Sequence, residues 1–188
     1  VVYYAAASLE VHRRHGSPAS FIVPAGNLGN SLACIWARRL GFPIGDIVLA
    51  HNANRTILDF LASGEYRPRP SIATLASAMD VGDPSNAERL RAFEPDWRKL
   101  RAELGAYSVS DEEIRAQIRG DFHRYGRIWC PHTATAARVY DLLAEKDRRS
   151  KVWVLVATAH PAKFDDIVEP LIGRAVDVPP ALARLLSL

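Results

Sequence analysis

The 188-residue sequence has only two cysteines and one methionine, and it has no hydrophobic run long enough to span a bilayer. Cys34 and Cys130 lack the spacing of a zinc site, and so few thiols indicate a reducing compartment. No basic and apolar leader opens the chain. We therefore expect a cytoplasmic protein without a membrane-spanning segment, a structural metal or a disulfide framework.

A concentrated basic face is also missing, although the net charge is +3. The densest basic group alternates with Glu145 and Asp147, which is typical of a solvated helix end. It consists of Lys146, Arg148, Arg149 and Lys151. Because nucleic-acid binding needs a continuous basic surface, we expect no nucleic-acid partner.

The two ends of the sequence carry no polar tail. The first residues, from Val1, have a helical apolar pattern without an initial methionine, and residues 182–188 are again apolar. A hydrophobic content of 48% is ordinary for a globular protein. We expect residues 1–188 to be one lobe of a longer enzyme.

Regular elements alternate along much of the chain. Apolar runs predict strands at 20–23, 47–50 and 152–156, and helical periodicity predicts helices at 31–40, 56–61, 133–144 and near 164–172. This order favours an α/β fold with an open, mostly parallel sheet flanked by helices. The run at 152–156 is nearly continuous, as in a central strand covered on both faces.

The middle of the chain follows a different pattern. Prolines at 68, 70, 84 and 95 interrupt it, a charged helix is expected at roughly 96–104, and Ser110 with Glu113 forms a capping box. We therefore expect residues 65–127 to form an irregular and helical excursion packed beside the sheet.

The strongest candidate binding segment lies between the first predicted strand and helix, with the sequence Gly26-Asn27-Leu28-Gly29-Asn30. Glycines allow an anion to approach the backbone, and amides at a helix start point toward it. The segment is neither a Walker loop nor a dinucleotide fingerprint. A phosphate site and a plain tight turn both remain open on this pattern.

A second candidate, Thr158, follows the strand at 152–156. Ligands of open α/β sheets bind at the carboxyl ends of strands, where a threonine hydroxyl can donate or accept a hydrogen bond. Thr158 could instead cap the next helix. The neighbouring His160 is expected to be structural.

Two further polar segments precede predicted helices. Ser85, Asn86 and Arg89 lie at a helix start after residues 77–84, and could form a second anion site or simply cap a surface helix. The segment from Cys130 to Ala134 says little alone, since the sequence has neither a Gly-x-Ser-x-Gly elbow nor a zinc motif.

Together, four segments in order resemble threonine synthase of the longer bacterial and fungal type. They lie at 23–30, between Arg67-Pro68 and Asn86, at 131–134 and at 158–164. The resemblance implies a pyridoxal-phosphate enzyme with the tryptophan-synthase-β-like fold, known as fold type II. It also implies that the loop Gly26–Asn30 holds the cofactor phosphate and that Thr158 bonds the pyridine nitrogen.

The sequence departs from that family in two places. Ala25 stands where the family usually has serine or threonine, which removes one possible phosphate ligand. The Schiff-base lysine of the family lies in an N-terminal Phe-Lys-Asp segment, and this chain has no such segment. Its lysines are Lys99, Lys146, Lys151 and Lys163, and the last belongs to a His-Pro-Ala-Lys-Phe motif.

The resemblance implies a threonine synthase that converts O-phospho-L-homoserine and water into L-threonine and phosphate. The catalytic lysine would come from an N-terminal lobe, so the fragment alone should not turn over. Two alternatives remain: a related lyase of the threonine dehydratase type, and a non-catalytic module that binds a phosphate ligand. The Ala-Met-Asp-Val and Thr-Ala-His-Pro-Ala-Lys-Phe segments argue against the dehydratase.

Overall fold

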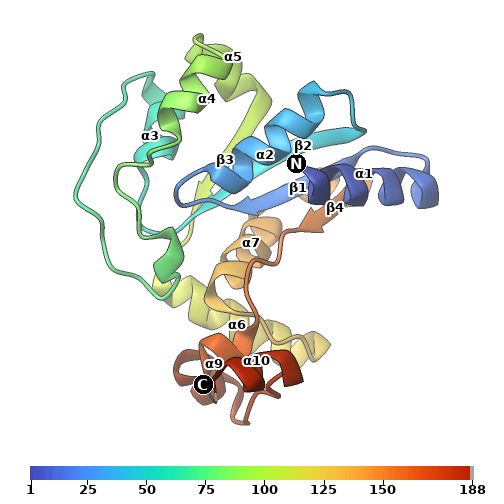
Figure 1. Ribbon diagram of the computed structural model, residues 1–188, viewed down its shortest axis with the longest axis vertical. Helices are drawn as coiled ribbons and strands as arrows, with labels where there is room; N and C mark the ends of the chain where they lie inside the picture. Colours follow the sequence, from blue (N-terminus) through green and yellow to red (C-terminus); the bar gives the residue numbers. More distant parts are fainter. Residues whose placement is uncertain (187–188) are drawn as a thin grey trace.

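A computed structural model describes residues 1–186, which form a four-stranded parallel sheet with helices on both faces (Figure 1). The strands are β1 (Ala19–Pro24), β2 (Ile44–His51), β3 (Leu104–Ser108) and β4 (Val152–Leu155). Their order is β3-β2-β1-β4, and every neighbouring pair is parallel. The expected open α/β architecture is confirmed.

Ten helices and two 3-10 turns lie within the described residues. Helices α1 and α2 contact one face of the sheet, whereas α7 contacts β1, β2 and β4, and α6 and α9 lie beyond it (Figure 1). In chain order they are α1 (Val2–His15), α2 (Gly29–Arg39), α3 (Thr56–Ser63), η1 (Ser77–Met79), α4 (Ala87–Phe93), α5 (Trp97–Glu103), α6 (Asp111–Tyr125), α7 (Pro131–Leu142), α8 (Glu145–Ser150), η2 (Pro161–Lys163), α9 (Asp165–Ile172) and α10 (Pro180–Leu186).

Strand β1 explains why the sheet separates two cores. Successive side chains of a strand point to opposite faces. Phe21 and Val23 belong to the core under α1 and α2, whereas Ile22 belongs to the core under α7. All three are almost fully buried. The strand predicted at 20–23 is confirmed, and its coverage on both faces explains the apolar run of residues 21–23.

The predicted helix signals are confirmed where they involve short-range contacts. Ser110 Oγ accepts a hydrogen bond from the Glu113 amide, and Glu113 Oε2 accepts one from the Ser110 amide, which completes the capping box of α6. Pro131 is the first residue of α7, where its missing N–H has no cost.

Two expectations about the sheet require correction. Residues 65–127 are not wholly irregular and helical, because β3 lies within them and pairs with β2. Its Leu-Gly-Ala-Tyr-Ser sequence has little strand propensity, so pairing stabilises it instead. Strand β4 is an edge strand rather than a central one among residues 1–186, and all four of its residues are only half-buried.

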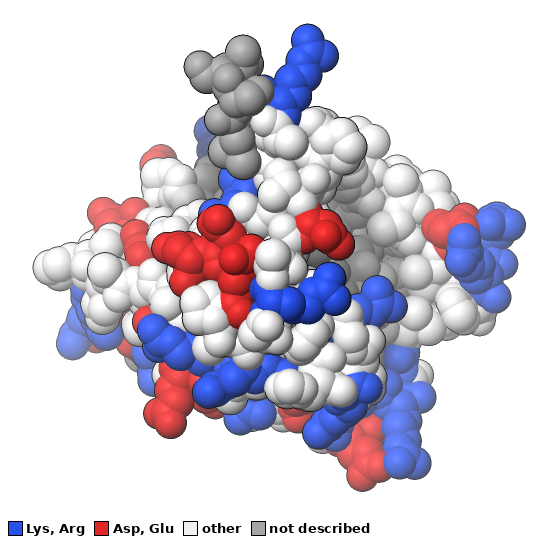
Figure 2. All heavy atoms as spheres, turned by 90° about the horizontal axis from the view of Figure 1, so that it is seen from below, with Lys and Arg blue, Asp and Glu red and all other residues white. Residues whose placement is uncertain are grey.

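The charged side chains on the face drawn in Figure 2 are of both signs. Figure 2 shows lysines and arginines interspersed with acidic residues over the face seen from below. None of the helices in the described residues combines the length and apolarity needed to cross a bilayer.

Because all four strands are parallel, their carboxyl ends meet at one edge of the sheet. The loop after β1, the asparagines after β2 and the segment after β4 therefore leave the sheet at the same edge. Open α/β sheets bind ligands at this edge.

Candidate functional site

The loop between β1 and α2 has the geometry of an anion-binding turn. The Ala25 amide donates to the Ala50 carbonyl at 2.8 Å, which fixes the end of β1 against β2. The first intrahelical bond of α2 runs from the Leu32 amide to the Leu28 carbonyl. The preceding amides at the start of the 11-residue helix lack intrahelical acceptors and carry the positive end of its dipole.

Leu28 gives this loop an unusual backbone. Its φ of 64° is the only positive value of a non-glycine residue in the described chain. Its side chain is 2% exposed, so burial in the core holds the residue in that conformation. Left-handed non-glycine residues cost free energy and cluster at ligand sites, where they aim backbone groups.

The two loop glycines serve different purposes. A Cβ at Gly26 would lie 2.8 Å from Met79 Cα and 2.9 Å from the Ala78 carbonyl oxygen, so neighbouring backbone requires glycine there. A Cβ at Gly29 would meet only Asn86 Nδ2, at 3.7 Å. This is an ordinary van der Waals contact, so the protein's own packing does not require glycine at position 29.

The segment before α4 is bound directly to this loop. Asn27 Oδ1 accepts hydrogen bonds from the Ser85 amide at 2.6 Å and the Ser85 hydroxyl at 2.9 Å. Asn86 Nδ2 donates to the Asn27 carbonyl at 2.8 Å. Ser85 and Asn86 thus fix the side chain and backbone of Asn27. Arg89 is exposed and forms no ion pair within residues 1–186.

A cavity of about 630 Å³ connects the loop with Thr158. We call it the α1 cavity, and it is lined by Tyr3, Tyr4, Ala7, Phe21, Asn30 and residues 154–158. The Tyr4 hydroxyl donates to Asn30 Oδ1 at 2.7 Å. Burial, with a smaller contribution from Cys34, raises the pKa of Tyr4 above its ordinary value, which keeps this donor protonated.

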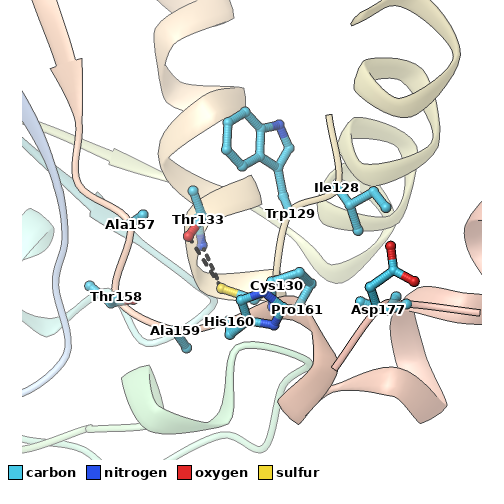
Figure 3. Close-up of a pocket in the computed structure, with 11 residues that line it drawn as sticks. Ile128, Trp129, Cys130, Thr133, Ala157, Thr158, Ala159, His160, Pro161 and Asp177 are labelled. Atoms are coloured by element: carbon cyan, nitrogen blue, oxygen red, sulfur yellow. Dashed lines mark hydrogen bonds between the residues drawn. The ribbon is translucent and has the colours of Figure 1, made fainter. Parts of the chain in front are cut away.

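Thr158 also lines a second cavity of about 640 Å³ (Figure 3), which we call the α7 cavity. Its other polar residues include Cys130, Thr133, His160 and Asp177. Thr158 is exposed, and its hydroxyl forms no hydrogen bond with any residue in the described range. The next turn is capped by His160 instead, whose Nδ1 accepts from the Ala162 amide at 3.2 Å. The capping alternative for Thr158 is therefore excluded.

The start of α7 forms one wall of this cavity. Cys130 Sγ accepts a hydrogen bond from the Thr133 amide at 3.4 Å, and lies 3.2 Å from the Thr133 hydroxyl (Figure 3). Cys130 therefore caps the helix, and Thr133 borders the same space as Thr158.

Burial shifts two histidine pKa values near this edge. Desolvation lowers the pKa of His51, the last residue of β2, to about 4. A hydrogen bond with the Ala25 backbone partly opposes this decrease. Desolvation also lowers the pKa of His132. The negative charge of Asp80 partly opposes this decrease, and the positive charge of Lys163 adds to it. Both imidazoles are therefore neutral near pH 7.

With this geometry in place, comparison with known proteins identifies the family. Residues 1–159 match the model of the family described as "Pyridoxal-phosphate dependent enzyme", and residues 133–188 match "Threonine synthase, C-terminal". The chain belongs to the pyridoxal-phosphate-dependent enzymes. The resemblance to threonine synthase is confirmed as well.

Several threonine synthases match almost the whole chain. That of Serratia marcescens is 35% identical over 97% of this chain, and that of Escherichia coli is 33% identical over 98%. The chain spans 42% of the length of each. The structure titled as threonine synthase from Brucella melitensis with bound PLP superimposes with a TM-score of 0.88 and 30% identity, over 99% of this chain and 45% of that one. These matches confirm the fold-type-II architecture.

The sequence did not predict the contacts of three features near the site. Tyr4 sits in an apolar helix, and His132 lies in a segment that matched the family without indicating what this side chain binds. The third is a polar cluster after β2, in which Asp80 Oδ1 accepts from Asn52 Nδ2 at 2.7 Å and Thr74 Oγ1 at 2.6 Å. The Tyr4–Asn30 contact spans 26 positions and the Asn52–Asp80 contact spans 28, so only the fold brings these residues together.

Proposed function

We propose that this chain is the C-terminal catalytic lobe of a threonine synthase that converts O-phospho-L-homoserine and water into L-threonine and phosphate. The observation that carries the proposal is the shared cavity. It joins Asn30, at the open start of α2, to the unpaired hydroxyl of Thr158. A phosphate and a ring nitrogen of one cofactor need two such anchors.

The residues of the loop suit the phosphate of pyridoxal phosphate. The free amides of Gly29, Asn30 and Ser31 would donate to phosphate oxygens, with the helix dipole adding to the attraction. Gly26, Asn27 and Leu28 would shape the turn. Since Ala25 offers no hydroxyl, binding there rests on backbone amides and the Asn30 side chain.

Thr158 would accept or donate a hydrogen bond at the pyridine nitrogen. Bound pyridoxal phosphate supplies an electron sink for the substrate carbanion. A neutral hydroxyl at the ring nitrogen does not force its protonation, whereas a carboxylate would. This choice moderates the sink and leaves further stabilisation to the protein.

We propose that Ser85, Asn86 and Arg89 lie at the substrate entrance. Ser85 and Asn86 hold Asn27, and the exposed guanidinium of Arg89 would attract the phosphate of the substrate. None of the four lysines, all within the described range, lines either cavity. The catalytic lysine would therefore belong to an N-terminal lobe, and "full-length protein" below means the chain with that lobe.

The decisive experiment measures phosphate and threonine released from O-phosphohomoserine by the full-length protein. Equal amounts of both products are expected, and the 188-residue chain alone should release neither. Formation of 2-oxobutyrate from threonine without phosphate release would favour the dehydratase alternative. A full-length protein that lacks the lysine and is inactive, yet binds a phosphate ligand, would favour the non-catalytic module.

We also propose a cytoplasmic location. Cys34 and Cys130 are both free and buried, which suits a reducing compartment. Fractionation of source cells followed by immunodetection tests this, and recovery outside the cytoplasm would overturn it.

A further inference from the structure

His132 connects α7 to a turn that lies against the phosphate-binding loop. Its side chain is 3% exposed, and its Nε2 accepts a hydrogen bond from the Ala78 amide at 3.1 Å. The two residues are 54 positions apart. Ala78 belongs to η1, whose Met79 is buried in the core under α7.

The backbone of η1 lies directly against Gly26. A Cβ at Gly26 would lie 2.8 Å from Met79 Cα and 2.9 Å from the Ala78 carbonyl oxygen. Because only glycine leaves room for this close approach of the η1 backbone, a displacement of η1 would disturb the packing that holds the turn. The position of η1 therefore sets the position of the loop that begins at Gly26.

The imidazole acts here as an acceptor. Nε2 can accept the Ala78 N–H only when it carries no proton, so the ring proton is on Nδ1. Nδ1 is buried and has no hydrogen-bond partner within residues 1–186. The buried, unpaired Nδ1–H costs free energy, and an apolar side chain at this position would avoid that cost. What histidine offers and an apolar side chain lacks is the acceptor at Nε2, which pairs with the Ala78 amide.

We propose that His132 is a positioning residue for the cofactor-binding loop: its neutral imidazole fixes the η1 turn, which braces Gly26 from behind. The proposal rests on the function proposed above, in which that loop binds the cofactor phosphate. It predicts that loss of the acceptor weakens cofactor binding although His132 never touches the cofactor.

The same arrangement makes the brace sensitive to pH. Protonation of Nε2 would direct an N–H against the Ala78 N–H and break the contact. The charged groups acting on the ring are the Asp80 carboxylate and the Lys163 ammonium, and its aromatic neighbour is Phe164, at 5.0 Å between ring centroids. Cofactor affinity should therefore fall as the pH decreases below the ordinary pKa of histidine.

The test compares His132→Phe, which keeps a ring without the acceptor, with His132→Gln, which keeps an acceptor. The exposed His123→Phe on α6 is the control. In the full-length protein, H132F should raise the Kd for pyridoxal phosphate about tenfold and speed amide exchange at Ala78 and Met79 about tenfold. H132Q should remain within about threefold of wild type at pH 7.5. Because burial lowers the pKa of His132, the comparison extends from pH 7.5 to 4.5, over which the affinity of wild type should fall more than that of H132Q.

The outcomes separate the two proposals. If H132F keeps the wild-type amide-exchange rates and the wild-type Kd for pyridoxal phosphate, the role of His132 is overturned. It is also overturned if H132Q binds the cofactor as weakly as H132F does while the two variants have equal melting temperatures. If H132F does not fold, the pH profiles of H132Q and wild type decide, and identical profiles overturn the role. A wild-type full-length protein that binds no pyridoxal phosphate overturns the proposed function, while the exchange rates still report on the brace.

Discussion

The Tyr4 hydroxyl donates a hydrogen bond to Asn30 Oδ1 at 2.7 Å and thereby fixes that amide oxygen toward α1. Helix α1 thus sets the orientation of a side chain at the start of α2. The donor is largely buried, and the hydrogen bond joins residues that are 26 positions apart.

Removal of this hydroxyl should weaken cofactor binding without unfolding the protein. Tyr4→Phe keeps the edge-to-face contact with Phe21 but releases the Asn30 amide. We expect the Kd for pyridoxal phosphate to rise about fivefold, as for the loss of one hydrogen bond. Equilibrium titration of the full-length protein measures it. Tyr125→Phe, at a 63% exposed position on α6 that lines neither the α1 cavity nor the α7 cavity, is the control and should match wild type.

The two loop glycines should respond differently to alanine. Gly26→Ala places a methyl group against the backbone of η1 and should cost about 2 kcal/mol of unfolding free energy. Gly29→Ala makes only an ordinary contact with Asn86, so its unfolding free energy should stay within about 0.5 kcal/mol of wild type. Its Kd for pyridoxal phosphate should nevertheless rise about tenfold, because the methyl group would crowd the phosphate in the proposed site. Urea unfolding and cofactor titration measure both, and unchanged affinity in G29A would remove the loop from the binding site.

Thr158 should matter more for turnover than for cofactor occupancy. Thr158→Val keeps the shape and removes the hydroxyl, so kcat should fall at least about tenfold while the Kd for pyridoxal phosphate changes less than about threefold. The reason is that, in the proposed function, the loop Gly26–Asn30 supplies much of the cofactor binding. Thr158→Ser restores a hydroxyl and should recover most of the turnover. Wild-type kcat in T158V would contradict the assignment.

His51 should make folding stability depend on pH. Its folded pKa of about 4 lies below the ordinary value of 6.5, so the unfolded state binds more protons between these values. The stabilisation is complete above pH 6.5 and is lost as the pH falls toward 4, amounting to about 3 kcal/mol. Urea unfolding of wild type and His51→Gln over pH 4–7 measures it. Parallel pH profiles for the two proteins would show that His51 contributes nothing.

The sequence predicted those parts of the fold that depend on neighbouring residues. The capping box at Ser110 needs contacts only three positions apart, and the burial of β1 follows from its apolar run. The strand β3 was missed because Gly105 and Ala106 favour no strand, and its pairing with β2 determines it. The edge position of β4 was also unpredictable, since an apolar run does not reveal how many neighbours a strand has.

The candidate site shows the same contrast between features that depend on neighbouring residues and features that depend on long-range contacts. Glycine spacing indicated an anion-binding loop, and position after a strand indicated Thr158. The bond from Ser85 to Asn27 spans 58 positions, and that from Ala78 to His132 spans 54. Residue types such as these have many structural uses, so no local pattern could assign them to one site.

Strand β4 carries a consequence for handling the isolated chain. Its Val-Trp-Val-Leu sequence contains no charge and no proline, and its outer edge has no partner strand among residues 1–186. Unpaired edges of this kind template the addition of strands from other molecules. The adjacent Lys151, held by Asp46 and Asp147, is the nearest charge that opposes such stacking. The 188-residue chain in isolation should therefore self-associate through β4 as its concentration rises.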